Sequence, residues 1–353
     1  MPKNKFSSIP SILRDAKKGK MFILVDDKDR ENEGDLVVPG SKCNSKIINF
    51  MAKHGRGLIC LALSKKQIDK LKLPLMSQIN KSRMQTAFTV SIEAKKGIST
   101  GISAFDRART IKVAINPNSK KKDIVSPGHV FPLVSRNGGV LERAGHTEAS
   151  IDISKLSNLN PSSVICEVMN EDGRMARLDD LIRFSKKHKI KIASIADLIA
   201  HRLKNERLVY KYYSKNLTLS KGQKIQLDVY RNKLNNYESF VLKKGKFSRN
   251  KAIHVRVLSN RTNRSNLLKN EEIKKNIKIL SKYKTFILVI INNAMINNSK
   301  KSETNLTLRY YGLGAQIIKD FNVRNMILLS RTKKKIIGLE GFDLKIKRQI
   351  IIK

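Results

Sequence analysis

The chain reads Met21-Phe22-Ile23-Leu24-Val25 and, shortly afterwards, Asp29-Arg30-Glu31-Asn32-Glu33-Gly34-Asp35. The first run predicts a buried strand, and the second gathers carboxylates and an arginine around one glycine. Hard divalent cations such as Mg²⁺ prefer oxygen ligands and usually take one or two protein carboxylates. The arginine offers the fork of donors that a phosphate or carboxylate requires. These residue types indicate a site for a divalent cation and an anionic substrate. Taken alone, the acidic run could instead be a charged surface turn with local ion pairs.

A second polar cluster, far along the chain, favours a shared site. Arg143-Ala144-Gly145-His146-Thr147-Glu148-Ala149 follows the glycine-rich turn Asn137-Gly138-Gly139. His146 can supply an imidazole nitrogen to a metal ion, while backbone amides and the Thr147 hydroxyl can bind an anion. Alone, His146 would be interpreted as a hydrogen-bonded loop histidine. Together with the first cluster, it predicts a site for a metal ion and a phosphorylated or polyhydroxylated substrate.

Two further residues are candidates for proton transfer. His129 lies in Ser126-Pro127-Gly128-His129-Val130-Phe131-Pro132, where the prolines restrict the backbone. Its imidazole can act as general acid or base near neutral pH, and a structural turn histidine is the alternative. Glu167 lies in the apolar run Ser163-Val164-Ile165-Cys166-Glu167-Val168-Met169. A buried carboxylate there needs a partner, whereas an outward-facing one on a half-exposed strand does not.

Several motifs occur in a fixed order and together resemble one known family. The motifs are residues 30–35, Ser-Thr-Gly-Ile-Ser-Ala-Phe-Asp-Arg-Ala at 99–108, Pro-Gly-His-Val-Phe-Pro at 127–132, and residues 143–149. Agreement among separate motifs is more specific than any single short motif. From about Phe6 to about Arg207, the chain resembles 3,4-dihydroxy-2-butanone-4-phosphate synthase of riboflavin biosynthesis.

The resemblance implies a reaction and a set of site residues. The family converts D-ribulose 5-phosphate to L-3,4-dihydroxy-2-butanone 4-phosphate and formate, with a pair of Mg²⁺ or Mn²⁺ ions, in a homodimer with active sites near the subunit interface. The implied metal ligands are Glu31 and His146. The implied substrate-binding residues are Arg30, Glu31, Asp35, Arg143, Ala144, Gly145, His146, Thr147 and Glu167. The implied catalytic residues are Asp35, His129 and Glu167, and we take Asp35 as the first proton acceptor.

Composition narrows the class of protein. The chain has 353 residues, 40% of them hydrophobic, which is enough for two domains. The three cysteines, Cys43, Cys60 and Cys166, predict no disulfide framework and fit a reducing cytoplasm, and no apolar run is long enough to span a membrane. A net charge of +43 attracts polyanions. Because lysine is abundant throughout and no nucleic-acid-binding motif is present, we expect nucleic-acid binding to be incidental.

Strand and helix signals alternate in residues 1–205, which predicts a layered α/β or α+β domain built on a mixed sheet. Strands are expected at 21–25, 57–63, 89–92, 130–133, 140–141 and 164–168, and helices at 7–18, 46–53, 65–71, 177–189 and 194–203. Residues 206–353 are expected to form a second α+β domain. Its expected strands are 226–230, 254–258, 286–291 and 326–329, and its expected helices are 271–283 and 311–321.

The second domain resembles GTP cyclohydrolase II unevenly. Residues 308–318, the Gly338-Leu339-Glu340-Gly341 turn and the segment 254–259 match that family. The family holds a catalytic zinc ion with three cysteines that follow this last segment. The chain has no cysteine after Cys166, so three thiolate ligands cannot be supplied. We therefore expect no zinc and no GTP hydrolysis, and the domain's role stays open among dimer platform, stabilising partner and regulatory module. The alternatives are a bifunctional enzyme with atypical ligands, and a nucleic-acid-binding protein on the same scaffold.

Overall fold

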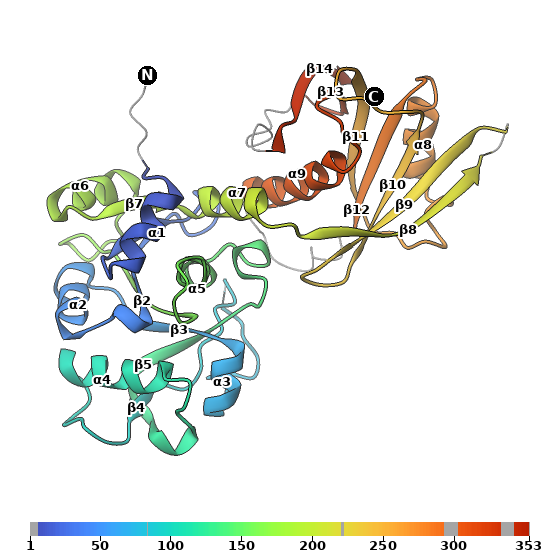
Figure 1. Cartoon of the computed structure of the whole chain (residues 1–353). Helices are drawn as coiled ribbons and strands as arrows, with labels where there is room; N and C mark the ends of the chain where they lie inside the picture. Colours follow the sequence, from blue (N-terminus) through green and yellow to red (C-terminus); the bar gives the residue numbers. More distant parts are fainter. Residues whose placement is uncertain (1–5, 83, 220–221, 293–302, 333–341, 353) are drawn as a thin grey trace. The chain divides into compact units, whose positions relative to one another are not determined.

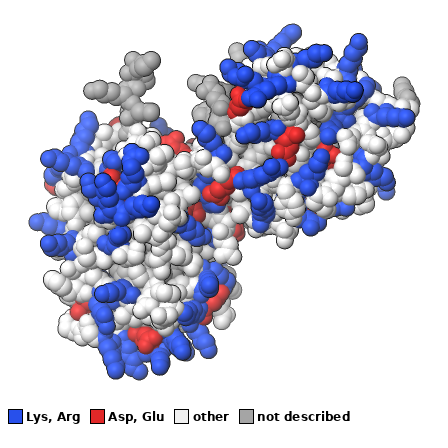
Figure 2. Space-filling model, in the orientation of Figure 1, with Lys and Arg blue, Asp and Glu red and all other residues white. Residues whose placement is uncertain are grey.

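A computed structural model describes residues 6–82, 84–219, 222–292, 303–332 and 342–352 (Figure 1). Internal contacts divide the chain into two compact units, Met1–Ile199 and Ala200–Lys353, and each unit is described by itself. The expected Gly338–Gly341 turn lies outside the described residues. Lysine and arginine side chains are spread over the visible surface of both units (Figure 2).

The first unit is built on a seven-stranded mixed sheet with the strand order β4-β5-β3-β6-β2-β1-β7. Its strands are β1 (Phe22–Val25), β2 (Gly34–Pro39), β3 (Cys60–Ser64), β4 (Ile92–Ala94), β5 (Ile124–Ser135), β6 (Ser162–Glu167) and β7 (Lys191–Ser194). β1 and β2 form an antiparallel hairpin, β2 pairs antiparallel with β6, and β7 runs parallel to β1. The carboxyl end of β1, the start of β2 and the end of β6 therefore meet at one edge.

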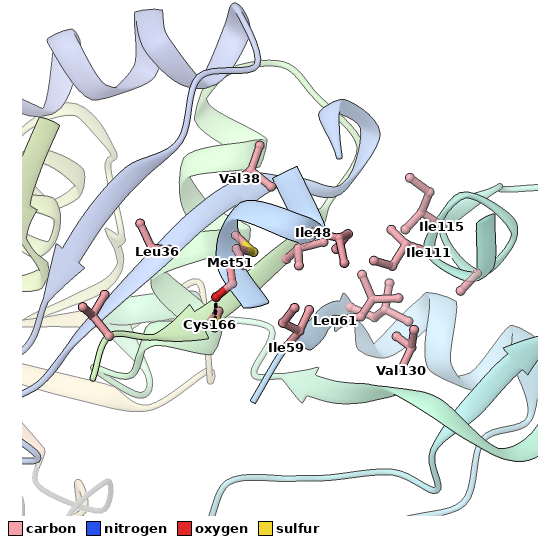
Figure 3. Packing of buried hydrophobic residues seen from close by; sticks show 14 of the residues in the cluster. Leu36, Val38, Ile48, Met51, Ile59, Leu61, Ile111, Ile115, Val130 and Cys166 are labelled. Carbon is pink, nitrogen blue, oxygen red and sulfur yellow. Dashed lines mark hydrogen bonds between the residues drawn. The ribbon is translucent and has the colours of Figure 1, made fainter. Parts of the chain in front are cut away.

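Helices pack against this sheet. The helices that lie wholly within this unit are α1 (Ile9–Lys17), α2 (Ser45–Phe50), α3 (Lys65–Leu71), α4 (Ala104–Ile115), α5 (His146–Leu156) and α6 (Leu178–His188). Helix α7 (Ile195–Asn205) begins in the first unit and ends in the second. Every residue of β1 is buried, as expected for a strand covered on both faces. In Figure 3, Ile111 and Ile115 of α4 face Ile48 of α2 and Leu61 of β3, all within one apolar cluster. Burial of each such side chain contributes about 1.5–3 kcal/mol.

The mixed-sheet fold predicted for the first unit is confirmed, with local differences. The strand expected at 89–92 overlaps β4 at Ile92 alone, and Thr89 forms only an isolated bridge with Leu75. The strand expected at 140–141 is wrong, because Gly139–Leu141 forms a turn of 3₁₀ helix. Two adjacent apolar residues are too few to show a strand period. Helices α4 and α5 were not expected, although α5 supplies part of the candidate site described below.

The second unit also has a seven-stranded sheet, with the order β14-β13-β11-β12-β10-β9-β8. Its strands are β8 (Val209–Thr218), β9 (Lys224–Asn232), β10 (Glu238–Lys244), β11 (Ala252–Asn260), β12 (Phe286–Asn292), β13 (Asn325–Ser330) and β14 (Lys345–Ile351). Its helices are α8 (Glu271–Leu280) and α9 (Glu303–Lys319). The strands β12, β11, β13 and β14 run parallel, and the remaining pairs are antiparallel.

The strands expected near 226–230, 254–258, 286–291 and 326–329 are confirmed as β9, β11, β12 and β13. Strands β8, β10 and β14 were not expected. β8 is exposed along most of its length, so its sequence lacks the apolar alternation of a half-buried strand. Among the described residues, every helix is too short or too polar to traverse a lipid bilayer.

Candidate active site

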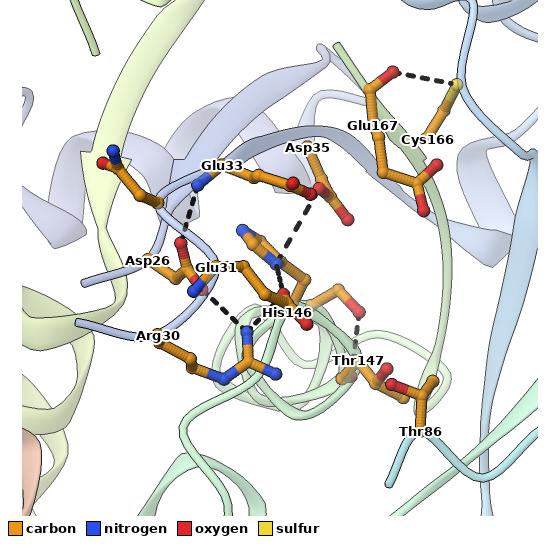
Figure 4. A network of polar contacts seen from close by, with 12 residues as sticks. Asp26, Arg30, Glu31, Glu33, Asp35, Thr86, His146, Thr147, Cys166 and Glu167 are labelled. Carbon is orange, nitrogen blue, oxygen red and sulfur yellow. Dashed lines mark hydrogen bonds and ion pairs between the residues drawn. The ribbon is translucent and has the colours of Figure 1, made fainter. Parts of the chain in front are cut away.

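One buried carboxylate organises the turn between β1 and β2. Asp26 directly follows β1, and its side chain is fully buried. Its Oδ2 accepts hydrogen bonds from Arg30 Nη1 at 2.7 Å and from the backbone amide of Glu31 at 3.2 Å. Its Oδ1 accepts from the backbone amide of Glu33 at 2.9 Å. Asn32 turns the chain with a φ of 57°, a conformation that asparagine tolerates. The turn is therefore closed around Asp26, which fixes the place of Glu31 (Figure 4).

His146 brings the second cluster to this turn. It is the first residue of α5, after the N-cap Gly145. Its Nδ1 lies 3.7 Å from Glu31 Oε2 and 3.8 Å from Asp35 Oδ1 (Figure 4). Its Nε2 is buried and has no hydrogen-bond partner within the described part of the chain. Buried polar atoms are nearly always satisfied, so this nitrogen is available to a ligand that the protein itself does not supply.

Ionic contacts set the charges of this cluster. Burial acts to raise the pKa of Glu31, but His146 and Arg30 outweigh burial and hold that pKa at about 2. Burial acts to lower the pKa of His146, but the Asp35 and Glu31 carboxylates raise it above its ordinary value. Burial raises the pKa of Asp35, and the neighbouring Glu167 adds to the rise while His146 opposes it. Glu31 is thus a permanent carboxylate, whereas Asp35 is suited to gain and lose a proton near neutral pH.

Glu167 stands beside Asp35 because the two residues are paired in the register of β2 and β6. Directly opposed residues of antiparallel strands lie on the same face of a sheet. Glu167 Oε2 accepts a hydrogen bond from the Leu58 amide at 2.9 Å. A Cβ atom at Gly57 would lie 2.5 Å from the Glu167 carbonyl oxygen and 2.6 Å from Oε2. The glycine therefore permits the close approach that holds the Glu167 carboxylate in place.

Two guanidinium groups flank the start of α5. Arg143 Nη1 donates to Glu148 Oε2 at 2.6 Å, and Arg143 Nη2 donates to Thr86 Oγ1 at 3.0 Å. A Cβ atom at Gly145 would collide with Arg143 Nη1 and lie 3.0 Å from Arg30 Nη2. The amino-terminal end of a helix carries partial positive charge and unpaired amides. Gly145 therefore lies between two cations at a helix start, and this arrangement suits a phosphate group.

The remaining members of the second cluster take less specific positions. Thr147 lies in the first turn of α5 and is buried. Ala144 lies between Arg143 and Gly145, directly before the helix begins. Both residues are neighbours of Gly145 and His146 in the sequence, so they lie next to the position suited to a phosphate group at the start of α5.

His129 belongs to a different part of the unit. It lies on β5 with an exposed side chain, and its Nδ1 pairs with Glu93 Oε1 of β4. A Cβ atom at Gly128 would collide with the backbone of Ile92, so only glycine allows β5 to approach β4 this closely. Among the contacts of the described residues, none joins this pair to Glu31 or His146.

Sequence reasoning missed two side chains that the geometry makes prominent. Asp26, Glu31 and His146 each offer a ligand atom, and these atoms lie within 4.8 Å of one another. The position of Asp26, immediately after an apolar strand, was the signal available in the sequence. Glu93 was also missed, because nothing in the sequence indicates that it pairs with His129.

Residues 10–201, more than half of the chain, match the family model for 3,4-dihydroxy-2-butanone 4-phosphate synthase. The protein of that name from Photobacterium phosphoreum is 42% identical over 355 residues, covering 96% of this chain and 98% of the relative. The chain belongs to the 3,4-dihydroxy-2-butanone 4-phosphate synthase family. It is an enzyme of riboflavin biosynthesis with this synthase activity, and the family resemblance inferred from its motifs is confirmed.

The relatives of this synthase include two-domain proteins. Residues 267–351 match the family model for GTP cyclohydrolase II, and the riboflavin biosynthesis protein RibBA of Aquifex aeolicus is 43% identical over 380 residues, covering 99% of this chain and 93% of the relative. The crystal structure of RibBX, a two-domain synthase from A. baumannii, covers 98% of this chain with a TM-score of 0.85 and 38% identity. A synthase structure described as a complex with two magnesium ions covers 57% of this chain and 98% of its own, with a TM-score of 0.54 and 35% identity.

Proposed function

We propose that this synthase converts D-ribulose 5-phosphate to L-3,4-dihydroxy-2-butanone 4-phosphate and formate at the site formed by the β1–β2 turn and the start of α5. The convergence of Glu31 and His146, with 3.7 Å between Oε2 and Nδ1, carries the proposal. The atoms of the two products add up to those of the substrate, so the reaction needs no oxidant or reductant and consumes no net water. Groups that bind the substrate, divalent cations, a base and proton donors are therefore sufficient.

Glu31 and His146 are the proposed ligands of Mg²⁺ or Mn²⁺, in a pair of ions as in the related structure described with two magnesium ions. The donor set fits such ions, because Glu31 stays ionised and the buried His146 Nε2 has no partner within the described residues. Asp26 adds a second carboxylate within reach, and hard cations prefer oxygen ligands. A bound divalent cation supplies Lewis acidity to the carbonyl and hydroxyl oxygens of the sugar.

The two ends of the substrate are assigned to different groups. Arg143, the start of α5 and Thr147 are proposed to bind the phosphate, since a bidentate guanidinium and helix amides match its geometry. Arg30 lies between this end and the carboxylates, because its guanidinium contacts Asp26 and Glu31 and also approaches Gly145. The sugar hydroxyls are thereby directed toward Asp35.

Asp35 is the proposed first base, which takes the proton from the carbon next to the carbonyl. Its raised pKa matches a general base that works near neutral pH. Glu167, opposite Asp35 on β6, is placed to take part in the proton transfers that accompany loss of one water molecule, its re-addition and the release of formate. His129, held by Glu93, is the second proposed participant. Each of these groups moves protons only, so no nucleophilic cysteine or serine is required.

The synthase is further proposed to work as a homodimer in the cytoplasm. Within one chain, the exposed His129–Glu93 pair has no contact with the Glu31–His146 cluster among the described residues, so a second copy is proposed to bring this pair to the site. Three free cysteines fit a reducing compartment. Nucleic-acid binding through the net charge of +43 is proposed to be incidental.

The second domain is proposed to be inactive on GTP. A catalytic zinc site needs thiolate, imidazole or carboxylate ligands, and the chain has no cysteine after Cys166. In the described part of the second unit, no group of histidine, cysteine and carboxylate ligands is close enough to hold a metal ion. GTP consumption by the purified protein, with and without added Zn²⁺, tests this. Zinc-dependent turnover of GTP would instead establish a bifunctional enzyme with atypical ligands.

Release of formate from ribulose 5-phosphate tests the proposed reaction. We expect Mg²⁺-dependent formate release by the wild-type protein and none by Glu31→Gln or His146→Asn. Asp29→Asn is the matched control, because Asp29 is exposed in the same turn and holds none of the groups of the cluster. Full activity of Glu31→Gln would refute the ligand assignment, and absence of formate with the wild-type protein would refute the reaction.

A further inference from the structure

The β1–β2 turn, which carries the proposed metal ligand Glu31, has backbone carbonyls as well as amides to satisfy. Asp26 accepts from the amides of Glu31 and Glu33. The carbonyl oxygens of Glu31 and Asn32 instead accept from a side chain far along the sequence, Arg177, whose Nη1 lies at 2.9 and 2.6 Å. A carboxylate and a guanidinium therefore satisfy opposite polar groups of the same turn.

Helix α6 fixes the backbone of Arg177. The residue is the N-cap of this helix, and its carbonyl accepts from the Leu181 amide at 2.8 Å. Its own amide donates to Asp180 Oδ2 at 2.9 Å, and Asn170 Nδ2 donates to the same oxygen at 3.3 Å. The backbone of Arg177 is thus held by the helix and by the loop before it, while its side chain reaches the β1–β2 turn.

Leu181 brings the same face of α6 against the turn. Residues four apart lie on one face of a helix, so Leu181 and Arg177 point the same way. Leu181 is fully buried, and a Cβ atom at Gly34 would lie 2.5 Å from its Cδ1. Glycine therefore permits the close approach of α6 directly before Asp35. The helix contacts the turn at two places, at the carbonyls through Arg177 and at Gly34 through Leu181.

A surface ion pair is the simpler interpretation of Arg177. Its side chain is 47% exposed, and Nη1 lies 3.7 Å from Glu33 Oε1. Such a pair contributes little, because solvent screens it. The contacts with the two carbonyl oxygens are shorter and act on the backbone. Because a peptide group is planar, a hydrogen bond to its oxygen sets the orientation of the whole group, and with it the direction of the Glu31 side chain.

We propose that Arg177 is a positioning residue of the synthase, which holds the peptide groups of Glu31 and Asn32 so that the Glu31 carboxylate faces His146. The inference rests on the proposed role of Glu31 as a metal ligand. Partners that orient a metal ligand typically contribute about 10–100-fold to metal affinity. Arg177 acts through the backbone, so its loss displaces Glu31 without removing a ligand atom.

Hydrogen exchange and Mn²⁺ titration of the full-length protein test this role. Arg177→Met removes the donors and keeps a long apolar side chain. In the metal-free variant, we expect amide exchange of residues 26–35 to quicken by at least about tenfold. Exchange in β3 is expected to stay at the wild-type rate, which shows that the variant is folded. The dissociation constant for Mn²⁺, followed by electron paramagnetic resonance, is expected to rise by at least about tenfold.

A conservative variant and a charge-matched control complete the experiment. Arg177→Lys is expected to recover most of the Mn²⁺ affinity, because both hydrogen bonds come from one nitrogen and an ammonium group has three donors. Arg174→Met removes the same charge from a side chain that is 85% exposed and pairs with Asp172. We expect this control to bind Mn²⁺ within about twofold of wild type, as for loss of a surface ion pair.

Unchanged exchange of residues 26–35 in Arg177→Met would overturn the proposal. So would faster exchange with wild-type Mn²⁺ affinity, which would leave Arg177 a merely structural role, and so would equal losses of affinity in Arg177→Met and Arg174→Met. If the wild-type protein binds no Mn²⁺, the ligand assignment of Glu31 and His146 fails, and the exchange rates alone decide whether Arg177 orders the turn.

Discussion

Replacement of Asp26 by asparagine should damage the synthase site without touching either proposed metal ligand. The side chain is fully buried and closes the β1–β2 turn through three hydrogen bonds, from Arg30 and from the amides of Glu31 and Glu33. Asparagine keeps the shape of the carboxyl group but exchanges one acceptor oxygen for an NH₂ group. The change therefore tests whether this carboxylate sets the position of Glu31.

The magnitude follows from the bonds that asparagine cannot accept. Its oxygen can keep the bond from the Glu33 amide, while its NH₂ group faces Arg30 Nη1 and the Glu31 amide, which lie 2.7 and 3.2 Å from Oδ2. A hydrogen bond from a charged donor contributes about 1.5–3 kcal/mol and one from a neutral amide about 0.5–1.5 kcal/mol. We expect the free energy of unfolding to fall by about 2–4 kcal/mol, which lowers Tm by roughly 5–15 °C for a unit of this size.

Calorimetry and steady-state formate release measure the two consequences. Because small displacements of positioned groups cost about a hundredfold in rate, we expect a fall in kcat of that order. Asp29→Asn is the control, since it removes the same charge from an exposed position in the same turn. Wild-type kcat and Tm in Asp26→Asn would refute the reasoning. Equal losses in both variants would show that the charge of the turn matters and the hydrogen bonds do not.

Three further substitutions separate the proposed roles. Asp35→Asn should lower kcat by about 10²–10⁴-fold with little change in KM, as for loss of a general base, and near-normal turnover in the formate assay would contradict that role. Glu93→Gln should lower kcat about tenfold or more while KM stays unchanged, because the carboxylate that orients His129 is lost. Glu93→Asp should recover part of the rate. A change confined to KM would argue against a positioning role for Glu93. Gly57→Ala places a methyl group 2.5 Å from the Glu167 carbonyl oxygen, so kcat should fall while the free energy of unfolding drops by only about 1–3 kcal/mol. Unchanged kcat would show that catalysis does not require the Glu167 carboxylate to be held beside Gly57.

The sequence was sufficient to predict that Glu31 and His146 lie together in one site. It was not sufficient to predict which other side chains contact them. Glu31 and His146 could be placed together because their motifs match one family in order. The pairing of Asp35 with Glu167 depends on the register of β2 and β6, which residue patterns within a single strand do not specify. The central place of Asp26 depends on backbone amides that become its donors only once the turn has closed.

Helix α5 shows why local patterns failed at the site itself. Ser150, Asp152 and Ser154 are buried in this helix, so polar residues occupy positions where an apolar stripe would be expected. Asp152 accepts from the Val140 amide at 2.8 Å, and the Ser154 hydroxyl donates to the Ser162 carbonyl at 3.0 Å. Tertiary hydrogen bonds thus satisfy side chains that, in the sequence alone, indicate a loop.

Binding of Mn²⁺, followed by electron paramagnetic resonance, tests the central claim most directly. The account predicts that the wild-type protein binds Mn²⁺ and that Glu31→Gln and His146→Asn each lose this binding, while Asp29→Asn keeps it. Retention of wild-type Mn²⁺ binding by both Glu31→Gln and His146→Asn would contradict the claim that these two side chains hold the metal ions of the synthase.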